Sequence, residues 1–178
     1  MLELYPENNA LISDIVVAQE LILKNHQSLR QMAHVLHSGI LEHFGLPAAL
    51  RKFGSDIEAP ADAETVEVNL ELSDNFPRLR PAAEIGIYRI VQEAVTNAMK
   101  HANAKTILIR LAHSGHSVEV IVRDDGRGFE INNLPAVGIG FASMRERADI
   151  IGARFAINST PGAGTEITIE LANDPEED

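Results

Sequence analysis

One segment of the chain groups polar side chains that could do chemistry along a single helical face. Residues 93–104 read EAVTNAMKHANA, and a helix there places Glu93 and Asn97 one turn apart, with the pair Lys100–His101 one turn further. An Asn oxygen is a neutral hard ligand that suits a Mg²⁺ ion already carrying phosphate oxygens. Glu93 could accept a proton from a nucleophile or orient a water molecule. The segment suits a metal-bound phosphate, and a solvated helix face explains the same pattern.

Three glycine-bearing segments follow this helix. Residues 124–129 (DDGRGF) close a Val/Ile-rich strand, where an aspartate can accept two donors, such as an exocyclic amine and a bridging water, and glycines leave room for a flat base. Residues 138–140 (GIG) lead into a helix whose exposed amides attract phosphate. Residues 162–165 (GAGT) precede the last strand, where a hydroxyl could reach back to the base. Taken singly, each segment is also an ordinary turn or loop.

The elements that must position these residues follow from the hydrophobic period. The alternation of apolar and polar residues over 65–72 predicts a strand with one wet face, and Pro81 suits the first turn of a helix that runs to about His101. The later elements are a hairpin of residues 107–111 and 118–122, a helix over 141–151 capped by Gly152, and a hairpin of residues 154–158 and 165–171. This order predicts an α/β (α+β) fold, a two-layer sandwich of a mixed sheet covered by helices on one face.

A long N-terminal helix precedes this sandwich. Its apolar residues recur at heptad spacing, at Ile15, Ile22, Leu29 and Leu36, with one polar interruption at Asn25. The pattern fits a coiled-coil seam and equally an amphipathic helix packed on its own domain. A polar, Pro-containing stretch marks the boundary to the sandwich. The expected parts are a helical segment, a linker, the α/β domain and an acidic tail, at residues 1–53, 54–63, 64–173 and 174–178.

Composition excludes several classes of protein. The 178-residue chain has a net charge of −11, which argues against a nucleic acid partner and against contact with an anionic membrane surface. It has no cysteine, so it has no disulfide or thiolate chemistry, and this fits a reducing, cytoplasmic compartment. No apolar run approaches the roughly 18 residues of a membrane span, and no signal peptide opens the chain.

The order and spacing of the motifs together resemble a known superfamily. ExxxNxxKHA, then DxGxG, then GxG before a helix, then GxGT is similar to the ATP-binding domain of the GHKL superfamily, which comprises gyrase-type topoisomerases, the large heat-shock chaperone, histidine kinases and mismatch-repair ATPases. Within it, NAMKHANAKT and GIGFASMRERADIIGA resemble sensor histidine kinases of the nitrate/nitrite-sensor and lipid-fluidity-sensor type. Residues 29–53 resemble the stretch that joins the second dimerisation helix to the catalytic domain there.

The resemblance implies that residues 64–173 are the ATP-binding catalytic domain of a two-component sensor histidine kinase and that residues 1–53 are part of its dimerisation and connector segment. Such a domain would transfer the γ-phosphoryl group of MgATP to a histidine that is not present in this chain. The cofactors would be ATP and Mg²⁺; Asn97 would hold Mg²⁺, and Glu93 would be the catalytic base or water-orienting group. Asp124 would accept from the adenine amino group, and Thr165 would join through water. Arg145 and Arg147 would reach phosphate, or one of them would instead be a surface residue. The full set that the resemblance assigns to ATP binding is Asn97, Lys100, His101, Asp124, Gly126, Gly128, Gly138, Gly140, Phe141 and Thr165.

One departure from the family concerns the phosphate acceptor. Family members carry an acceptor histidine in an ExHD-like motif on a first dimerisation helix, and no such motif is present. His34, His37 and His43 fit packing or surface roles better, and His26 is a poor acceptor candidate because no acidic residue directly follows it. The chain is therefore expected to be a fragment of a longer kinase, or else a protein that acts on another chain's histidine. Its expected partners are that histidine, a downstream response regulator and a second copy bound through the N-terminal helix.

Two other functions fit parts of the pattern. A GHKL serine/threonine kinase of the anti-sigma type needs no acceptor helix, but the helical seam speaks against it. A non-enzymatic interaction module would keep the fold without the nucleotide, but the intact Glu93, Asn97, Asp124 and glycine set counts against that alternative.

Overall fold

The computed structural model describes residues 39–57, 66–115, 117–130 and 139–172. The chain divides into two units, residues 1–39 and 40–178, and the description below concerns the second. The predicted heptad seam, the segment 131–138 that contains Gly138, and the acidic tail lie outside the described residues. Within the described ranges, no helix has the length and apolar character needed to cross a membrane.

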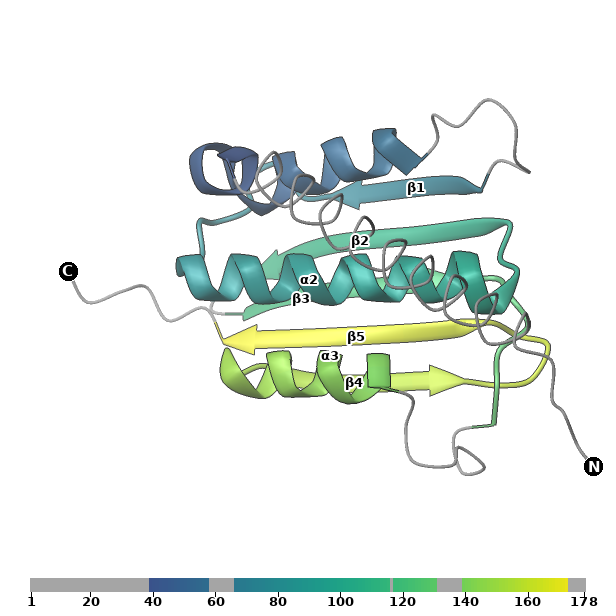
Figure 1. Ribbon diagram of the computed structural model, residues 1–178. Coiled ribbons are helices and arrows are strands. Elements are labelled where there is room, and N and C mark those ends of the chain that lie inside the picture. The colour runs from purple at the N-terminus through teal and green to yellow at the C-terminus, as the bar shows by residue number, and fades with distance from the viewer. Residues whose placement is uncertain (1–38, 58–65, 116, 131–138, 173–178) are drawn as a thin grey trace, which may run out of the picture. The chain divides into compact units, whose positions relative to one another are not determined.

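A five-stranded mixed sheet forms one layer of the domain (Figure 1). The strands lie in the order β1-β2-β3-β5-β4, in which β1 and β2 are parallel and the other pairs are antiparallel. Their bounds are Glu67–Leu72 for β1, Thr106–Ser114 for β2, Ser117–Asp124 for β3, Arg154–Ser159 for β4 and Thr165–Ala172 for β5. The predicted mixed sheet is confirmed.

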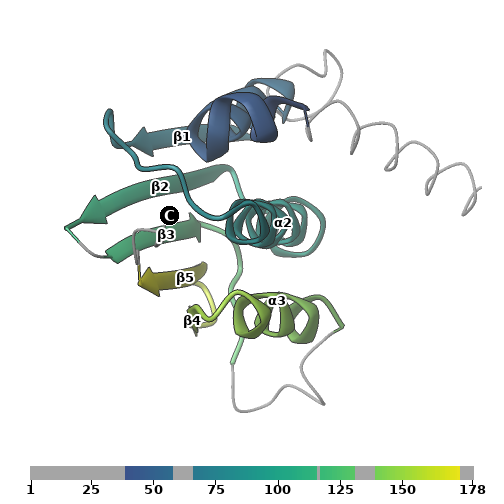
Figure 2. The same cartoon turned by 90° about the vertical axis from the view of Figure 1, so that its left-hand side faces the viewer.

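The helices form the second layer, and Figure 2 shows all of them on one face of the sheet. They are the helix of residues 39–57, α2 (Pro81–Asn97), a π-helical turn η1 (Ala98–Ala102) and α3 (Ile139–Ile150). Alternate residues of β3, such as Val118 and Val120, are buried beneath them because side chains on a strand alternate between its two faces. The opposite face carries cross-strand ion pairs, Arg110–Glu71, Arg123–Glu166 and Arg154–Glu170.

The helix of residues 39–57 extends further than the sequence predicted. Residues 54–57, expected to begin the linker, are helical. Gly54 allows this, because a Cβ atom there would lie 3.1 Å from the Leu70 side chain of β1, so the helix packs close to the strand. Phe53 meets Tyr88 of α2 edge-on, with ring centroids 6.0 Å apart. These contacts attach the end of the helix to β1 and α2.

A positive-φ glycine interrupts the same helix, and an arginine from the loop before α2 binds there. Gly45 has φ +79°, and the Arg78 guanidinium donates to the Glu42 carbonyl at 3.0 Å. Its Nε lies 3.0 Å from Oε1 of Glu84, a carboxylate that is only 2% exposed. The backbone N–H of Leu79 also donates to Glu84, at 3.2 Å. Arg78 therefore joins the start of α2 to the carbonyls that precede the interruption.

We expect Arg78→Met to lower the free energy of unfolding by about 2–3 kcal/mol, because it leaves the buried Glu84 carboxylate without its cation. The value lies at the low end for buried pairs because the Arg78 side chain is 53% exposed. Urea denaturation measures the loss. The control is the double variant Arg78→Met/Glu84→Gln, which removes the charge and should recover most of the stability. A double variant no more stable than Arg78→Met alone would refute the ion-pair explanation.

Candidate functional site

Four parts of the chain meet at one end of the domain, on the right-hand side of Figure 1. They are the end of α2 with η1, the end of β3 with the loop that follows it, the start of α3, and the start of β5. A cavity of about 410 Å³ lies between them, within the range of small-molecule sites. It is lined by Glu93, Ala94, Asn97, Ala98, His101, Ala102, Val122, Asp124, Arg127, Gly128, Phe129, Gly140, Phe141, Thr165 and Ile167.

The π-helical turn decides which polar residues of the first motif reach the cavity. The sequence predicted a continuous helix to about His101, but α2 ends at Asn97 and η1 follows. A π-turn takes up about one residue more than an α-turn, so it rotates each following side chain backward around the axis. His101 thereby stays on the face of Glu93 and Asn97 and lines the cavity, whereas Lys100 turns outward, is exposed and lies outside the lining.

The two aspartates of the DDGRGF motif have separate roles. Asp124 is buried and lines the cavity, and its Oδ1 accepts from the Gly126 N–H at 2.8 Å. Burial raises the pKa of Asp124, opposed by the amides of Gly126 and Thr165 that donate to it. Asp125 is exposed, outside the cavity lining, and accepts from the N–H groups of Lys105 at 2.8 Å and Thr106 at 2.9 Å. The Thr106 amide is the main reason that the pKa of Asp125 is lowered.

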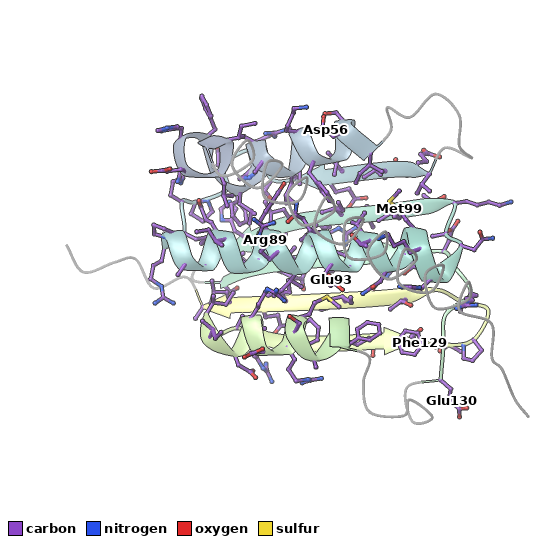
Figure 3. The ribbon with its side chains drawn as sticks, in the orientation of Figure 1. Asp56, Arg89, Glu93, Met99, Phe129 and Glu130 are labelled. Atoms are coloured by element: carbon purple, nitrogen blue, oxygen red, sulfur yellow. The ribbon has the colours of Figure 1, made fainter. Side chains whose placement is uncertain are left out.

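The start of α3 lies against the polar side chains of α2. A Cβ atom at Gly140 would lie 2.5 Å from Oε1 of Glu93 and 3.3 Å from Nδ2 of Asn97, so a larger residue there would force the Glu93 carboxylate to move. Figure 3 labels Glu93 on α2 beside this start of α3. The first amides of a helix have no partners within it and favour an anion. This end of the cavity therefore combines a carboxylate, an amide and a helix N-terminus.

An aromatic pair that the sequence reasoning only half identified forms one wall. Phe141, predicted, and Phe129, not predicted, have ring centroids 5.3 Å apart and both line the cavity. Figure 3 labels Phe129 at this end of the domain. Its position directly after Gly128 in the DxGxG motif was the available signal. Arg127, also missed, lines the cavity and donates its N–H to the Ala102 carbonyl at 2.8 Å.

Gly126 does not line the cavity, but it packs closely against the end of η1. A Cβ atom at Gly126 would lie 2.5 Å from Cβ of Ala102 and 2.6 Å from the carbonyl oxygen of the same residue. Glycine therefore lets the loop after β3 contact the end of η1. Of the predicted set, Lys100 and Gly126 lie outside the lining and Gly138 outside the described residues; the other members line the cavity.

The two arginines of the MRER segment have contacts away from the cavity. The Arg145 guanidinium lies over the Phe155 ring, 5.3 Å from its centroid. Arg147 donates from Nη1 to the Ser143 carbonyl at 3.0 Å. Neither residue lines the cavity, so these contacts support a packing role for both.

The polar side chains of the cavity fit a magnesium ion whose coordination shell is filled mainly by water and by the phosphate oxygens of a bound ligand. In the ranges that the structure describes, no three His, Asp or Glu side chains converge to hold a metal. The Asn97 amide and the Glu93 carboxylate have no hydrogen-bond or ion-pair partner among the described residues, although both line the cavity. One amide oxygen with a nearby carboxylate suits Mg²⁺, which keeps most of its coordination shell for water and phosphate oxygens.

Comparison with known proteins gives one family for most of this unit. Residues 82–175 match the model of the histidine kinase-, DNA gyrase B-, and HSP90-like ATPases. An uncharacterized sensor-like histidine kinase of Chloroflexus aurantiacus is 35% identical over 153 residues, which are 82% of this chain and 25% of that protein. The histidine-protein kinase/phosphatase DegS of Brevibacillus brevis is 24% identical over 166 residues, 93% of this chain and 42% of DegS.

Solved structures of histidine kinases have the same fold as this chain. The histidine kinase domain of a blue-light activated histidine kinase from Erythrobacter litoralis superposes with a TM-score of 0.62 at 26% identity, over 72% of this chain and 61% of that one. The histidine kinase AdeS of Acinetobacter baumannii has the same fold, with a TM-score of 0.62 over 89% of this chain and 85% of that one at 14% identity. The chain spans between a quarter and about two fifths of the two curated relatives.

Proposed function

The chain belongs to the family of histidine kinase-, DNA gyrase B-, and HSP90-like ATPases, as an ATP-binding domain of the histidine kinase type, and on this premise we propose that it binds MgATP and transfers the γ-phosphoryl group to a histidine outside this chain. We assign the role of catalytic base or water-orienting group to Glu93. The family match shows the type of domain. The phosphoryl transfer and the role of Glu93 are our proposals, because the chain covers only part of its curated relatives.

A single observation supports the proposal best: one cavity has two chemically different ends. The buried acceptors Asp124 and Thr165 lie opposite each other at paired positions of β3 and β5, which suits the amino group of adenine. Glu93, Asn97 and the start of α3 form the other end, which suits a metal-bound triphosphate. Gly128 and the aromatic pair Phe129–Phe141 lie along the same cavity, and flat rings suit contact with a base.

Phosphoryl transfer needs positioning and charge stabilisation more than covalent chemistry by the protein. Asn97 would hold Mg²⁺, which supplies positive charge to the phosphates when it is bound. Glu93 lies beside the first turn of α3 and is placed to accept the proton of an attacking group. His101 lines the same part of the cavity and can donate a hydrogen bond to phosphate. Lys100 is less well placed, because η1 turns it outward.

The partners follow from the proposed reaction. The acceptor histidine would lie on a dimerisation helix, and the phosphoryl group would pass on to a response regulator. We propose that residues 1–39 belong to a dimerisation and connector segment. We propose that the catalytic domain begins at residue 40 rather than at the expected residue 64, because Leu41 and Leu50 of the helix of residues 40–57 are buried in its core. An ATP-dependent unit of this kind is expected to act in the cytoplasm.

Asn97→Ala tests the phosphate end of the cavity. Calorimetry should show that the wild-type chain binds ATP more tightly with Mg²⁺ than with EDTA, and that Asn97→Ala loses this gain. Stability should hardly change, because the Asn97 amide has no partner among the described residues. Thr96→Ala is the matched control, because Thr96 hydrogen-bonds to the Gln92 carbonyl and lies outside the cavity lining. A Mg²⁺-dependent gain that persists in Asn97→Ala would refute the role of Asn97. No binding of ATP by the wild type would refute the proposed function itself.

A further inference from the structure

A serine that belongs to none of the predicted motifs connects three parts of the site. Ser159 ends β4 and is partly buried. Its Oγ accepts from the backbone N–H of Phe129 at 2.9 Å and donates to the carbonyl of Gly164 at 3.0 Å. The same oxygen lies 3.1 Å from Oγ1 of Thr165. Ser159 is therefore hydrogen-bonded to the loop after β3, to the turn before β5 and to the hydroxyl of Thr165, a residue that lines the cavity.

The single proton of the Ser159 hydroxyl sets the direction of its hydrogen bond with Thr165. A serine hydroxyl has one proton, and the Gly164 carbonyl can only accept it. The Phe129 N–H can only donate, so it uses a lone pair of Ser159. The contact between Ser159 and Thr165 must then use the proton of Thr165. Thr165 donates to Ser159, and the lone pairs of its Oγ1 remain for a molecule in the cavity.

The neighbouring Asp124 has the same polarity. Asp124 and Thr165 are directly paired in register on β3 and β5, and both are buried. An ionised carboxylate can only accept, and two backbone amides already fix its orientation. Both polar groups at this end of the cavity are thus acceptors. Such a pair of acceptors can receive hydrogen bonds from an amino group. It disfavours a carbonyl oxygen, because that oxygen is itself an acceptor and no donor would lie between it and the pair.

We propose that Ser159 is a specificity-determining residue, which acts by fixing the Thr165 hydroxyl as an acceptor and so makes the site prefer a 6-aminopurine nucleotide over a 6-oxopurine nucleotide. This inference rests on the proposed binding of a purine nucleotide with its base between Asp124 and Thr165. Without Ser159, the Thr165 hydroxyl is free to rotate and to donate to a carbonyl oxygen, so the preference becomes smaller.

The test measures base selectivity rather than affinity alone. ATP and ITP differ only at position 6 of the base and its neighbouring ring nitrogen, and calorimetry with Mg²⁺ gives the ratio of their dissociation constants. Ser159→Ala is expected to reduce the preference for ATP about fivefold, the effect of one ordinary hydrogen bond. Ser159→Thr, which keeps a hydroxyl, is expected to retain most of the wild-type ratio.

A double-mutant cycle separates this role from a merely structural one. In a Thr165→Val background, Ser159→Ala should leave the ATP-to-ITP ratio unchanged, because the hydroxyl that it orients is absent. Should Ser159→Ala fail to fold, Ser159→Cys keeps the size with a weaker hydrogen-bonding group and is expected to lower the ratio part of the way. Equal weakening of ATP and ITP, or a ratio shift that persists with Thr165→Val, would overturn the inference. Absence of binding to either nucleotide by the wild type would instead overturn the proposed function.

Discussion

Asp124→Asn is expected to weaken ATP binding by about 10- to 100-fold, the range for losing a hydrogen bond to a charged group. The carboxylate is buried, and its oxygens serve both the Gly126 amide and the cavity. The asparagine amide replaces one acceptor oxygen with a donor, which must then face either the backbone N–H groups or the amino group of the base. Calorimetry with MgATP measures the loss.

The adjacent carboxylate provides the matched control. Asp125→Asn should leave ATP affinity within about twofold, because Asp125 binds the Lys105 and Thr106 amides away from the cavity, and it should lower the melting temperature by a few degrees. Equal losses of affinity in the two variants would show that the base end of the cavity is misassigned.

The raised pKa of Asp124 and the lowered pKa of Asp125 are expected to change folding stability with pH in opposite directions. Burial raises the pKa of Asp124, so ATP affinity should fall as the pH drops through that raised value, because protonation removes an acceptor. For folding, the same raised pKa means that ionising Asp124 costs stability as the pH rises from the unfolded-state value through the folded-state value. The lowered pKa of Asp125 gives the reverse sign, a contribution present above the unfolded-state value and lost as the pH falls through the folded-state value. Asp124→Asn should abolish the first effect and leave the last intact.

Gly164→Ala is expected to cost about 3–5 kcal/mol of folding stability, from left-handed backbone strain together with overpacking. Gly164 has φ +79°, and a Cβ atom there would overlap the backbone carbonyl oxygen of Asp124. That carbonyl belongs to β3, which is paired with β5 from Asp124↔Thr165 onward, so it cannot move without breaking the sheet. Urea denaturation measures the loss, and the folded fraction should bind ATP poorly because Asp124 and Thr165 are displaced.

A second glycine of the same turn isolates the overlap from the strain. Gly162 has φ +80° and nothing within 4 Å of a built Cβ atom. Gly162→Ala should therefore cost only the backbone strain, about 1–2 kcal/mol. If Gly162→Ala and Gly164→Ala destabilised the chain equally, the close packing of the turn on the end of β3 would not be what requires glycine at position 164.

Much of the fold was predictable because its elements have strong local periods. The alternation along β3 alone places Val118, Val120, Val122 and Asp124 on one face of the strand, and the structure buries all four. The helix before the site begins at Pro81 as predicted. Its end was not predicted, because the π-turn that exposes Lys100 has no local signal as clear as a helix-breaking residue. The helix of residues 39–57 extends past Phe53 because it packs on Leu70 and Tyr88, which lie further along the chain.

The family, the order of the elements and the residue types that could hold a nucleotide could be predicted from the amino-acid sequence, because they depend on local period and on motif spacing. Which of those residues share a cavity depended also on the folded arrangement of the chain. His101 rather than Lys100 lines it, because η1 rotates the end of the helix, whereas the choice of Asp124 over Asp125 was already expected from the alternation along β3. The tertiary structure also places the Ser159 hydroxyl 3.1 Å from the Thr165 hydroxyl across a turn. The hydrogen bond that Ser159 accepts from the Phe129 N–H joins segments that are far apart in the chain, and no local pattern encodes the pairing of such segments.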